Sequence, residues 1–248
     1  SSERFSNRVE NYVKYRPGYP DAVLRLLREE MGLTPESVIA DVGSGPGISA
    51  RMFLENGSTV YAVEPNEAMR SAAERLLGDF PNFISCRGKA EETGLPNGSV
   101  DFAIAAQAFH WFDAEGTREE FVRILKPGGH IVLIWNERHL DSTPFLREYE
   151  QFLLVLAIDY TMVRHENIDK AALARFFRRE FRTAVFPNAQ VFDFEGLLGR
   201  ALSSSYMPAE DDPRFPQMRD ELKALVAKHA ENGKIELRYD TAVHYTQI

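Results

Sequence analysis

Residues 38–47 combine a carboxylate with a glycine-rich turn, which is an arrangement suited to holding a small ligand. Asp41 lies near the end of an apolar run, and three glycines follow at every second position from Gly43 to Gly47. Glycine permits positive φ and close approach of a ligand to the backbone, and a helix that starts after the turn offers free N–H groups. A carboxylate at this entry suits an ammonium or a sulfonium better than a pyrophosphate.

Two well-known phosphate-binding patterns do not fit this turn. The dinucleotide pattern G-x-G-x-x-G would require a third glycine at position 48, which is Ile48. The Walker pattern requires Gly-Lys-Ser or Gly-Lys-Thr, and neither follows. The spacing therefore argues against a nucleoside triphosphate site. It also argues against a nicotinamide cofactor, although a nicotinamide site stays open as an alternative.

A second carboxylate, Glu64, directly follows the apolar run at residues 59–63. An acid at the end of the second strand of such a fold accepts hydrogen bonds from ribose hydroxyls. Asp41 and Glu64 could each instead cap a helix or solvate a strand end. Their placement at strand ends one strand–helix unit apart favours a nucleoside site.

These residues require parallel strands to bring them to one edge. Short β-rich runs alternate with helical patterns between residues 37 and 135, which is typical of βαβ units. The expected strands are 38–42, 59–63, 82–86, 102–106 and 130–135. Several are apolar at consecutive residues, as expected where helices cover both faces of a sheet.

Two helices between these strands have recognisable beginnings. Asn66 is predicted to cap a helix that Gly78 ends, and Asp113 is predicted to cap the next. The buried face expected for the first helix comprises Met69, Ala72, Ala73, Leu76 and Leu77. The second is expected to bury Phe121, Val122 and Leu125.

The pattern changes after Trp135. A helix is expected to begin at Ser142 or Thr143, a second helix to span about 169–181, and a sixth strand to span 182–186. Residues 188–233 are poorly determined by pattern, apart from one expected helix that carries Met218, Leu222, Leu225 and Val226. The alternation near the C-terminus predicts a strand. We therefore expect one domain over 1–248, with a cofactor-binding core at about 33–140, a helical substrate-side cap or insertion at about 141–234 and a C-terminal strand at 235–248.

The overall composition disfavours several partners. A formal charge of −8 argues against broad contact with nucleic acid. The single cysteine, Cys86, lies in an apolar run where a core position is expected, and the six histidines are scattered, so no metal site is predicted. No apolar run reaches the ~20 residues of a membrane helix, and the polar start does not resemble a signal peptide, so a cytoplasmic protein is expected. The sequence leaves the oligomeric state open.

Five short motifs follow one another in the N-terminal half. They are Asp41-Val42-Gly43-Ser44-Gly45-Pro46-Gly47, Val63-Glu64-Pro65-Asn66, Lys89-Ala90-Glu91-Glu92, the run from Asp101 to Trp111, and Leu125-Lys126-Pro127-Gly128-Gly129. As an ordered set they resemble class I S-adenosylmethionine-dependent methyltransferases, in the type 11-like small-molecule group that includes trans-aconitate and ubiquinone-pathway methyltransferases. The likeness covers roughly residues 10–140.

The resemblance implies a doubly wound, Rossmann-like α/β fold, with a mostly parallel seven-stranded sheet and an antiparallel C-terminal strand. It implies S-adenosyl-L-methionine as cofactor and S-adenosyl-L-homocysteine as product. Asp41 would lie near the ammonium, Glu64 at the ribose hydroxyls and Gln107 beside the methionine chain. The full set of implied cofactor residues is Asp41, Gly43, Ser44, Gly45, Glu64, Pro65, Asn66, Ala90, Glu91, Gln107 and Arg16.

The acceptor side is less determined. His110 follows the fourth strand, where it would act as a general base or hydrogen-bond the substrate, or only line the pocket. Arg138 would clamp a substrate carboxylate or face solvent. The candidate substrate-binding residues are Tyr15, Tyr19, Trp111 and Arg138. Residues 203–206 would line the acceptor pocket or, as the pattern favours, form a surface loop.

The sequence thus predicts a methyltransferase that moves a methyl group from S-adenosylmethionine to a small molecule by in-line displacement. Oxygen, nitrogen and carbon acceptors all remain open. Two other functions stay as alternatives, an NAD-dependent oxidoreductase on a Rossmann sheet and a non-catalytic S-adenosylmethionine-binding protein. A nucleic-acid methyltransferase is a weaker third alternative, which a basic channel beside His110 would favour.

Overall fold

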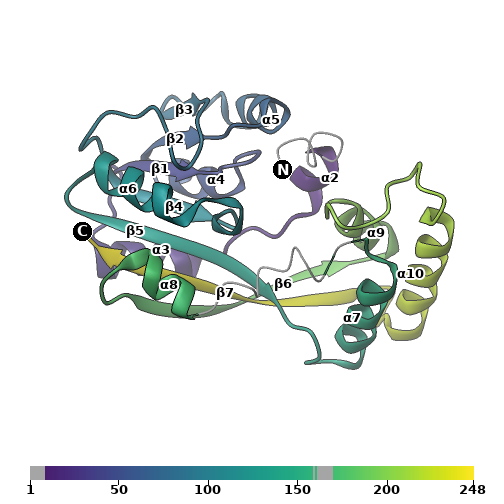
Figure 1. The fold of residues 1–248 in the computed structure, drawn as a ribbon. Coiled ribbons are helices and arrows are strands. Elements are labelled where there is room, and N and C mark those ends of the chain that lie inside the picture. The colour runs from purple at the N-terminus through teal and green to yellow at the C-terminus, as the bar shows by residue number, and fades with distance from the viewer. Residues whose placement is uncertain (1–8, 159, 161–169) are drawn as a thin grey trace.

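The computed structural model describes residues 9–158, 160 and 170–248. A seven-stranded sheet lies at its centre, in the order β3-β2-β1-β4-β5-β7-β6 (Figure 1). The strands are β1 (Val38–Val42), β2 (Thr59–Val63), β3 (Phe83–Cys86), β4 (Val100–Ala106), β5 (Leu125–Arg138), β6 (Arg182–Phe192) and β7 (Ile235–Gln247). Strands β1 to β5 are parallel, and β7 runs antiparallel to both β5 and β6. The predicted α/β fold with an antiparallel C-terminal strand is confirmed.

Helices cover both faces of this sheet. The described helices are α2 (Val9–Tyr15), α3 (Asp21–Met31), α4 (Ile48–Glu55), α5 (Glu67–Leu77), η1 (Phe109–Trp111), α6 (Ala114–Ile124), α7 (Pro144–Leu156), α8 (Lys170–Phe177), α9 (Phe194–Leu202) and α10 (Phe215–His229). One apolar cluster joins the sheet to α3 and α4, and another joins it to α6 and α8. Within the described ranges, no helix is both long and apolar enough to cross a membrane.

The predicted helix caps are present. The Asn66 side chain accepts a hydrogen bond from Met69 N at 3.0 Å, and Asp113 Oδ2 accepts one from Gly116 N at 3.0 Å. Of the two residues proposed for the start of α7, Thr143 is the cap, with its Oγ1 3.1 Å from Leu146 N. Each cap satisfies a backbone N–H that the first helical turn leaves unpaired.

Two residues expected on buried helix faces are exposed. Leu76 is 41% exposed because it lies beside the stripe that α5 buries, which ends with Leu77 at 1% exposure. Val122 is 38% exposed because the buried stripe of α6 runs at helical spacing through other residues. That stripe consists of Thr117, Glu120, Phe121 and Ile124.

Two strands are longer and one helix is shorter than the sequence predicted. Strand β5 starts at Leu125, and β6 continues to Phe192 because β7 pairs with it along its whole length. Helix α8 ends at Phe177, since Arg178 has a φ of +53° that no α-helix accommodates. The predicted start of that helix, Asp169, lies outside the described residues.

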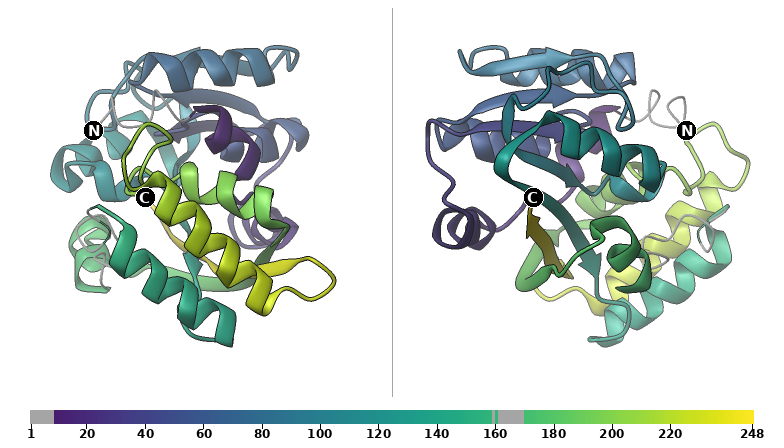
Figure 2. Two further views of the ribbon diagram at one scale, coloured as in Figure 1. Left: turned by 90° about the vertical axis from the view of Figure 1, so that its right-hand side faces the viewer. Right: turned by 60° about the vertical axis from the view of Figure 1, so that its left-hand side comes forward.

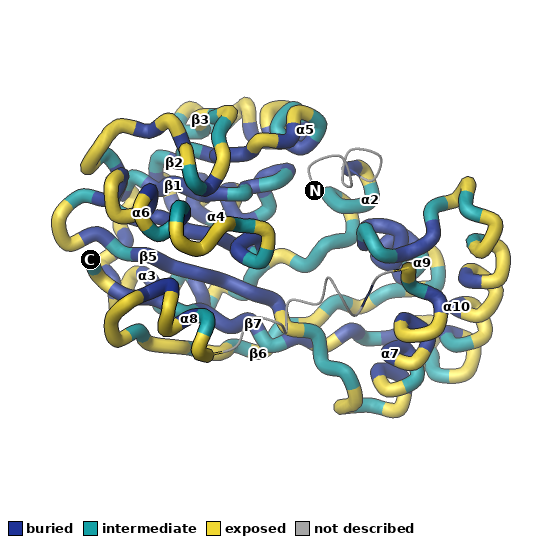
Figure 3. The backbone as a smooth tube through the Cα atoms, viewed as in Figure 1, coloured by how far each residue is buried: buried dark blue, intermediate teal, exposed yellow. Residues whose placement is uncertain are grey.

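The far ends of β6 and β7 carry a separate group of helices. There α7, α9 and α10 share an apolar cluster that includes Tyr149, Leu197 and Leu222 (Figures 1 and 2). Buried and exposed residues alternate along α7 and α10 (Figure 3). Helix α2 bridges the two parts of the molecule, because it contacts both α5 and α9.

Candidate active site

Two adjoining cavities lie where the parallel strands end. The main cavity is lined by residues that follow β1 and β4, by the last residues of β5, and by residues from α2, α9 and β7. The side cavity is lined by residues that follow β1, β2 and β4 and by Tyr12 and Met69. The two cavities share five lining residues, Tyr12, Gly43, Gly45, Gln107 and Trp111. They therefore form one continuous hollow at the edge where sheets of this kind bind ligands.

The glycine turn leaves room for a ligand beside its backbone. Gly43, Gly45 and Gly47 have φ values of +70°, +55° and +90°. A Cβ on Gly43 would lie 2.7 Å from Ala108 Cβ, whereas a Cβ on Gly45 would meet no atom within 4 Å. The space beside Gly45 opens into both cavities, so a bound molecule can lie directly against the turn.

Asp41 is fully buried beneath this turn. Its Oδ2 accepts a hydrogen bond from Ser49 Oγ at 2.7 Å, while its Oδ1 has no partner among the described residues. Burial raises the pKa of this carboxyl to about 7; the hydrogen bond from Ser49 opposes the rise and the nearby Glu64 adds to it. The Ser44 hydroxyl, which lines the main cavity, likewise has no partner in the described part of the chain. A cationic group with N–H donors would supply what both groups lack.

Glu64 lies in the side cavity with Pro65 and Asn66. Its Oε2 accepts from Gly45 N at 3.0 Å and its Oε1 accepts from Asn66 N at 2.8 Å. Burial raises the pKa of Glu64, against the effect of these two hydrogen bonds. Each oxygen retains capacity for another donor, so the carboxylate can accept a pair of hydroxyls on the cavity side.

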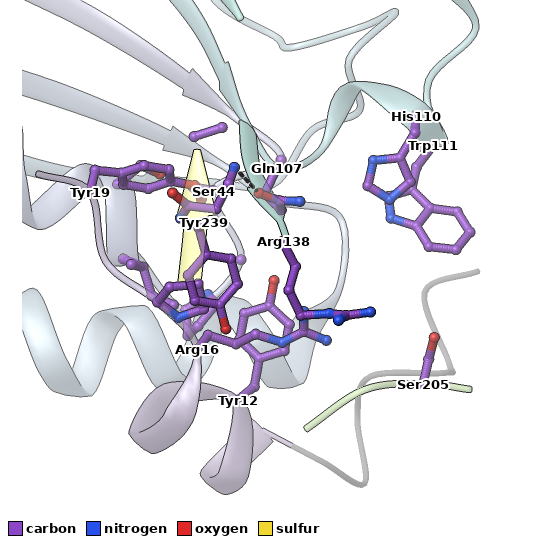
Figure 4. A pocket seen from close by; sticks show the side chains of 18 of the residues that line it. Tyr12, Arg16, Tyr19, Ser44, Gln107, His110, Trp111, Arg138, Ser205 and Tyr239 are labelled. Atoms are coloured by element: carbon purple, nitrogen blue, oxygen red, sulfur yellow. Dashed lines mark hydrogen bonds between the residues drawn. The ribbon is translucent and has the colours of Figure 1, made fainter. Parts of the chain in front are cut away.

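The end of β4 is held in an unusual conformation. Gln107 has a φ of +56°, and its Oε1 accepts a hydrogen bond from Asn136 N at 2.8 Å, which ties the β4 and β5 ends together. His110 and Trp111 follow in η1 and line the main cavity, with ring centroids 4.8 Å apart. Figure 4 shows these two rings on one side of the cavity, across from Arg16, Tyr12 and Tyr239. A left-handed non-glycine residue at this position is consistent with a site that stores backbone strain.

Ala90 and Glu91 lie apart from the lining of either cavity. Ala90 is buried, and Glu91 Oε1 accepts a hydrogen bond from Asp113 N at 2.9 Å. Their predicted contact with the adenine edge stays a prediction.

The three N-terminal candidates divide into two groups. Arg16 and Tyr19 line the main cavity. Tyr15 does not line it, because its ring packs against Gly199 of α9 and lies 6.5 Å from the Phe192 ring. The structure thus gives Tyr15 a contact between α2 and α9 and no contact with the cavity.

Arg138 lines the main cavity and does not face solvent, since only 9% of its side chain is exposed. Its guanidinium pairs with Glu150 of α7 and lies 2.9 Å from Tyr160 Oη. The favoured surface-loop prediction for residues 203–206 is wrong. Ser203 and Ser204 are buried, and Ser205 and Tyr206 line the cavity.

The prediction from sequence missed Arg200, Tyr160 and Tyr239, which also line the main cavity. A signal for Arg200 was present. Asp193 caps α9, and apolar residues then recur at helical spacing with Arg200 among them. A charged residue among apolar positions of a short helix indicates a buried polar site. Within the described ranges, no cluster of three His, Cys, Asp or Glu residues is placed to hold a metal ion.

Comparisons with known proteins agree with this geometry. A family model described as "Methyltransferase domain" matches residues 40–133, which contain the glycine turn, Glu64 and η1. An uncharacterized methyltransferase of Schizosaccharomyces pombe is 26% identical over 248 residues, covering 98% of this chain and 96% of the relative. An uncharacterized methyltransferase of Geobacillus sp. (strain WCH70) is 32% identical over 189 residues, covering 74% of this chain and 84% of the relative.

The fold has solved counterparts. A structure from Anaeromyxobacter dehalogenans, described as a candidate type II methyltransferase, superposes with a TM-score of 0.69 at 23% identity and covers 94% of this chain and 98% of that one. The sheet order, the cavity at the strand ends and the matched relatives together place the chain in the class I methyltransferase family.

Proposed function

We propose that the protein transfers a methyl group from S-adenosylmethionine to a small-molecule acceptor. One observation carries the proposal. Two buried carboxylates, Asp41 and Glu64, flank a glycine turn that opens into a hollow, and Asp41 Oδ1 lacks a partner among the described residues. This donor and acceptor set is complementary to an ammonium at one end of a ligand and a ribose at the other.

The residues present fit this cofactor. Glu64 would accept the ribose hydroxyls, while Pro65 and Asn66 would flank the adenine in the side cavity. Asp41 would attract the ammonium, and Arg16 would lie near the carboxylate of the methionine group. The backbone at Gly43 and Gly45, with Ser44 and Gln107, would line the path between them. Ala90 and Glu91 are proposed at the adenine edge only through the family resemblance.

The chemistry needs a positioned nucleophile more than an activated one. When bound, S-adenosylmethionine supplies a methyl group on a sulfonium, and the acceptor forms the new bond as the sulfur leaves with the bonding pair in an in-line displacement. His110 and Trp111 lie in the cavity that both reactants would share. We propose that His110 orients the acceptor and takes its proton where the acceptor must lose one, and that Trp111 lines the pocket.

We further propose that residues of about 141–234 act as a substrate-side cap within one methyltransferase domain. Arg200, Ser205 and Tyr206 come from this segment and line the main cavity opposite the glycine turn. Tyr19 of the N-terminal segment lines the same cavity and is proposed to cover the acceptor. The cap would exclude water from the reacting groups.

Calorimetric titration with S-adenosylmethionine, S-adenosylhomocysteine and NAD tests the proposal. The first two should bind saturably and NAD should not. Glu64→Ala should weaken S-adenosylhomocysteine by roughly tenfold to a hundredfold, because two charge-assisted hydrogen bonds are lost. Glu67→Ala is a matched control, since Glu67 is an exposed acid three residues away on α5.

Two results would contradict the proposal. Saturable binding of NAD without S-adenosylhomocysteine would favour the oxidoreductase alternative. Folded protein that binds neither compound would contradict any adenosine site in this hollow.

A further inference from the structure

The main cavity is rich in cations. Arg16, Arg138 and Arg200 all contribute to its lining, and none of its described lining residues is Asp or Glu. Tyr160, Tyr206 and Tyr239 supply phenol groups around them. The part of the cavity that these residues line is therefore positively charged and can donate many hydrogen bonds.

Arg138 differs from the other two arginines because its charge is already balanced. Its guanidinium pairs with Glu150, donates to Tyr160 Oη at 2.9 Å and lies over the Tyr149 ring at 5.3 Å. Tyr160 Oη in turn donates to Glu150 Oε2 at 2.8 Å. This cluster holds α7 against the end of β5 without needing a ligand.

Among the described residues, the hydrogen-bond partners of Arg16 and Arg200 are neutral oxygens, and the Arg16 guanidinium also lies over the Tyr12 ring, 4.8 Å from its centroid. Arg16 Nη2 donates to Ser203 O at 3.0 Å and lies 3.4 Å from Ser204 Oγ. Arg200 Nη1 lies 3.1 Å from Ser204 Oγ and 3.5 Å from Ser203 Oγ, and its guanidinium also hydrogen-bonds Tyr239. The Nε atoms of both arginines have no partner in the described part of the chain, and no described carboxylate pairs with either side chain.

Arg16 is half-buried and Arg200 is buried, and two like charges that share the serines of one short loop are costly without an anion. Arg200 is 8% exposed. Burial and the charge of Arg200 both lower the pKa of Arg16, which reflects the mutual repulsion of the two guanidiniums. Burial lowers the pKa of Arg200 too, but the phenols of Tyr239, Tyr206 and Tyr149 outweigh it, so the pKa is raised and Arg200 stays charged. An anionic group that entered the cavity would offset the charge of both guanidiniums.

The two arginines have different neighbours. Arg16 lies toward the glycine turn, because it also lines a neighbouring pocket with Pro46 and Gly47. Under the proposed function, Arg16 would face the carboxylate of the methionine group. Arg200 lies farther into the cap, with Tyr206 and Tyr239, and has no counter-charge from the described part of the chain or from the cofactor.

We propose that Arg200 is the acceptor-binding residue and that the acceptor is a small carboxylic acid whose carboxylate it holds. Tyr206 and Tyr239 flank this position, and the reacting atom of the acceptor lies toward His110 and Trp111. A guanidinium holds a carboxylate with two parallel hydrogen bonds, so it fixes the orientation of the acceptor as well as its affinity. This assignment rests on the proposed function, because it places the acid beside a bound cofactor.

The test uses the full chain saturated with S-adenosylhomocysteine. Succinate, citrate and benzoate are titrated by calorimetry, with succinamide and benzamide as neutral counterparts and inorganic phosphate as a second anion. At least one carboxylate should bind saturably while its amide does not. Arg200→Met should weaken that binding at least about tenfold, as expected when a charge-assisted hydrogen bond is lost. Arg200→Lys should lose less affinity for the carboxylate, since lysine keeps the positive charge but cannot donate two parallel hydrogen bonds.

Arg219→Met controls for loss of a positive charge elsewhere, because Arg219 is an exposed residue of α10. The affinity of Arg200→Met for S-adenosylhomocysteine should stay within about twofold of the unaltered chain, which shows that the variant is folded. Carboxylate binding that is unchanged in both Arg200 variants would overturn the inference, as would binding of phosphate alone or equal binding of acids and amides. Failure of the unaltered chain to bind S-adenosylhomocysteine would instead contradict the proposed function.

Discussion

Asp41 makes cofactor binding sensitive to pH in a predictable direction. In the ligand-free protein its carboxyl has a pKa of about 7 because it is buried, so much of it is protonated below neutrality. An ammonium beside the free Oδ1 requires the ionised form. Protons therefore compete with the cofactor, and affinity should rise as pH rises.

The size of the effect follows from this pKa. If the carboxylate is ionised in the complex, the dissociation constant of S-adenosylhomocysteine should increase about tenfold for each unit by which the pH falls, once the pH is well below 7. Between pH 7.5 and 5.5 the ionised fraction falls from roughly 0.8 to 0.03, which predicts binding weaker by roughly 25-fold. Calorimetric titration at half-unit steps over this range measures the slope.

The same group affects the ligand-free fold with the opposite sign. A pKa raised from 3.8 to about 7 means that the folded state binds more protons than the unfolded state between these values. The free energy of unfolding should therefore fall as pH rises from about 4 to 7, by about 4 kcal/mol at 1.36 kcal/mol per pH unit for this group alone. Asp41→Asn removes the titration and preserves the acceptor for Ser49.

The variant supplies the control for both measurements. Its affinity for S-adenosylhomocysteine should be weaker and should depend less steeply on pH, because Glu64, whose pKa is also raised, is the carboxyl that still titrates in the site. The difference between its unfolding curve and that of the unaltered chain should follow the expected slope. A flat dissociation constant in the unaltered chain, or the same slope in Asp41→Asn, would refute the reasoning.

Two further predictions concern the contacts that hold the cap and N-terminal helix in place. Gly199→Ala would place a Cβ 2.1 Å from Tyr15 Cε2, so we expect a loss of about 1–3 kcal/mol in thermal unfolding; Gly18→Ala, where a Cβ meets no atom within 4 Å, should change little. An unchanged melting temperature for Gly199→Ala would mean that α2 does not pack closely against α9. Glu150→Gln leaves the guanidinium of Arg138 without its carboxylate partner and should lower the free energy of unfolding by about 3–5 kcal/mol, measured by denaturant unfolding. A cost near zero would show that this pair is solvated.

The sheet and its helix caps were largely predictable from local signals. Asn66 and Asp113 each precede an amphipathic run, and each caps its helix in the structure. The parallel strands are short apolar runs separated by such helices, so their order along the chain indicated the fold. Exposure was harder to predict, because Leu76 and Leu77 are neighbours of the same type and only Leu77 falls on the stripe that α5 buries.

The cofactor side of the site was also predictable, since the glycine turn and Glu64 lie in consecutive strand–helix units. The cap side was not. Arg200 reaches the cavity only because β6 and β7 extend beyond the rest of the sheet and carry α9 to that position. Likewise, Arg138 was expected in contact with substrate or solvent, and its partner Glu150 lies on a helix whose packing the local pattern does not specify.

The most direct test of the central claim is a crystal structure of the chain with S-adenosylhomocysteine. The account predicts adenosine in the side cavity, with both ribose hydroxyls hydrogen-bonded to Glu64, and an ammonium that approaches Asp41 along the glycine turn. The carboxylate of the homocysteine group should lie toward Arg16. A ligand bound elsewhere, or bound here with its ribose away from Glu64, would contradict the account.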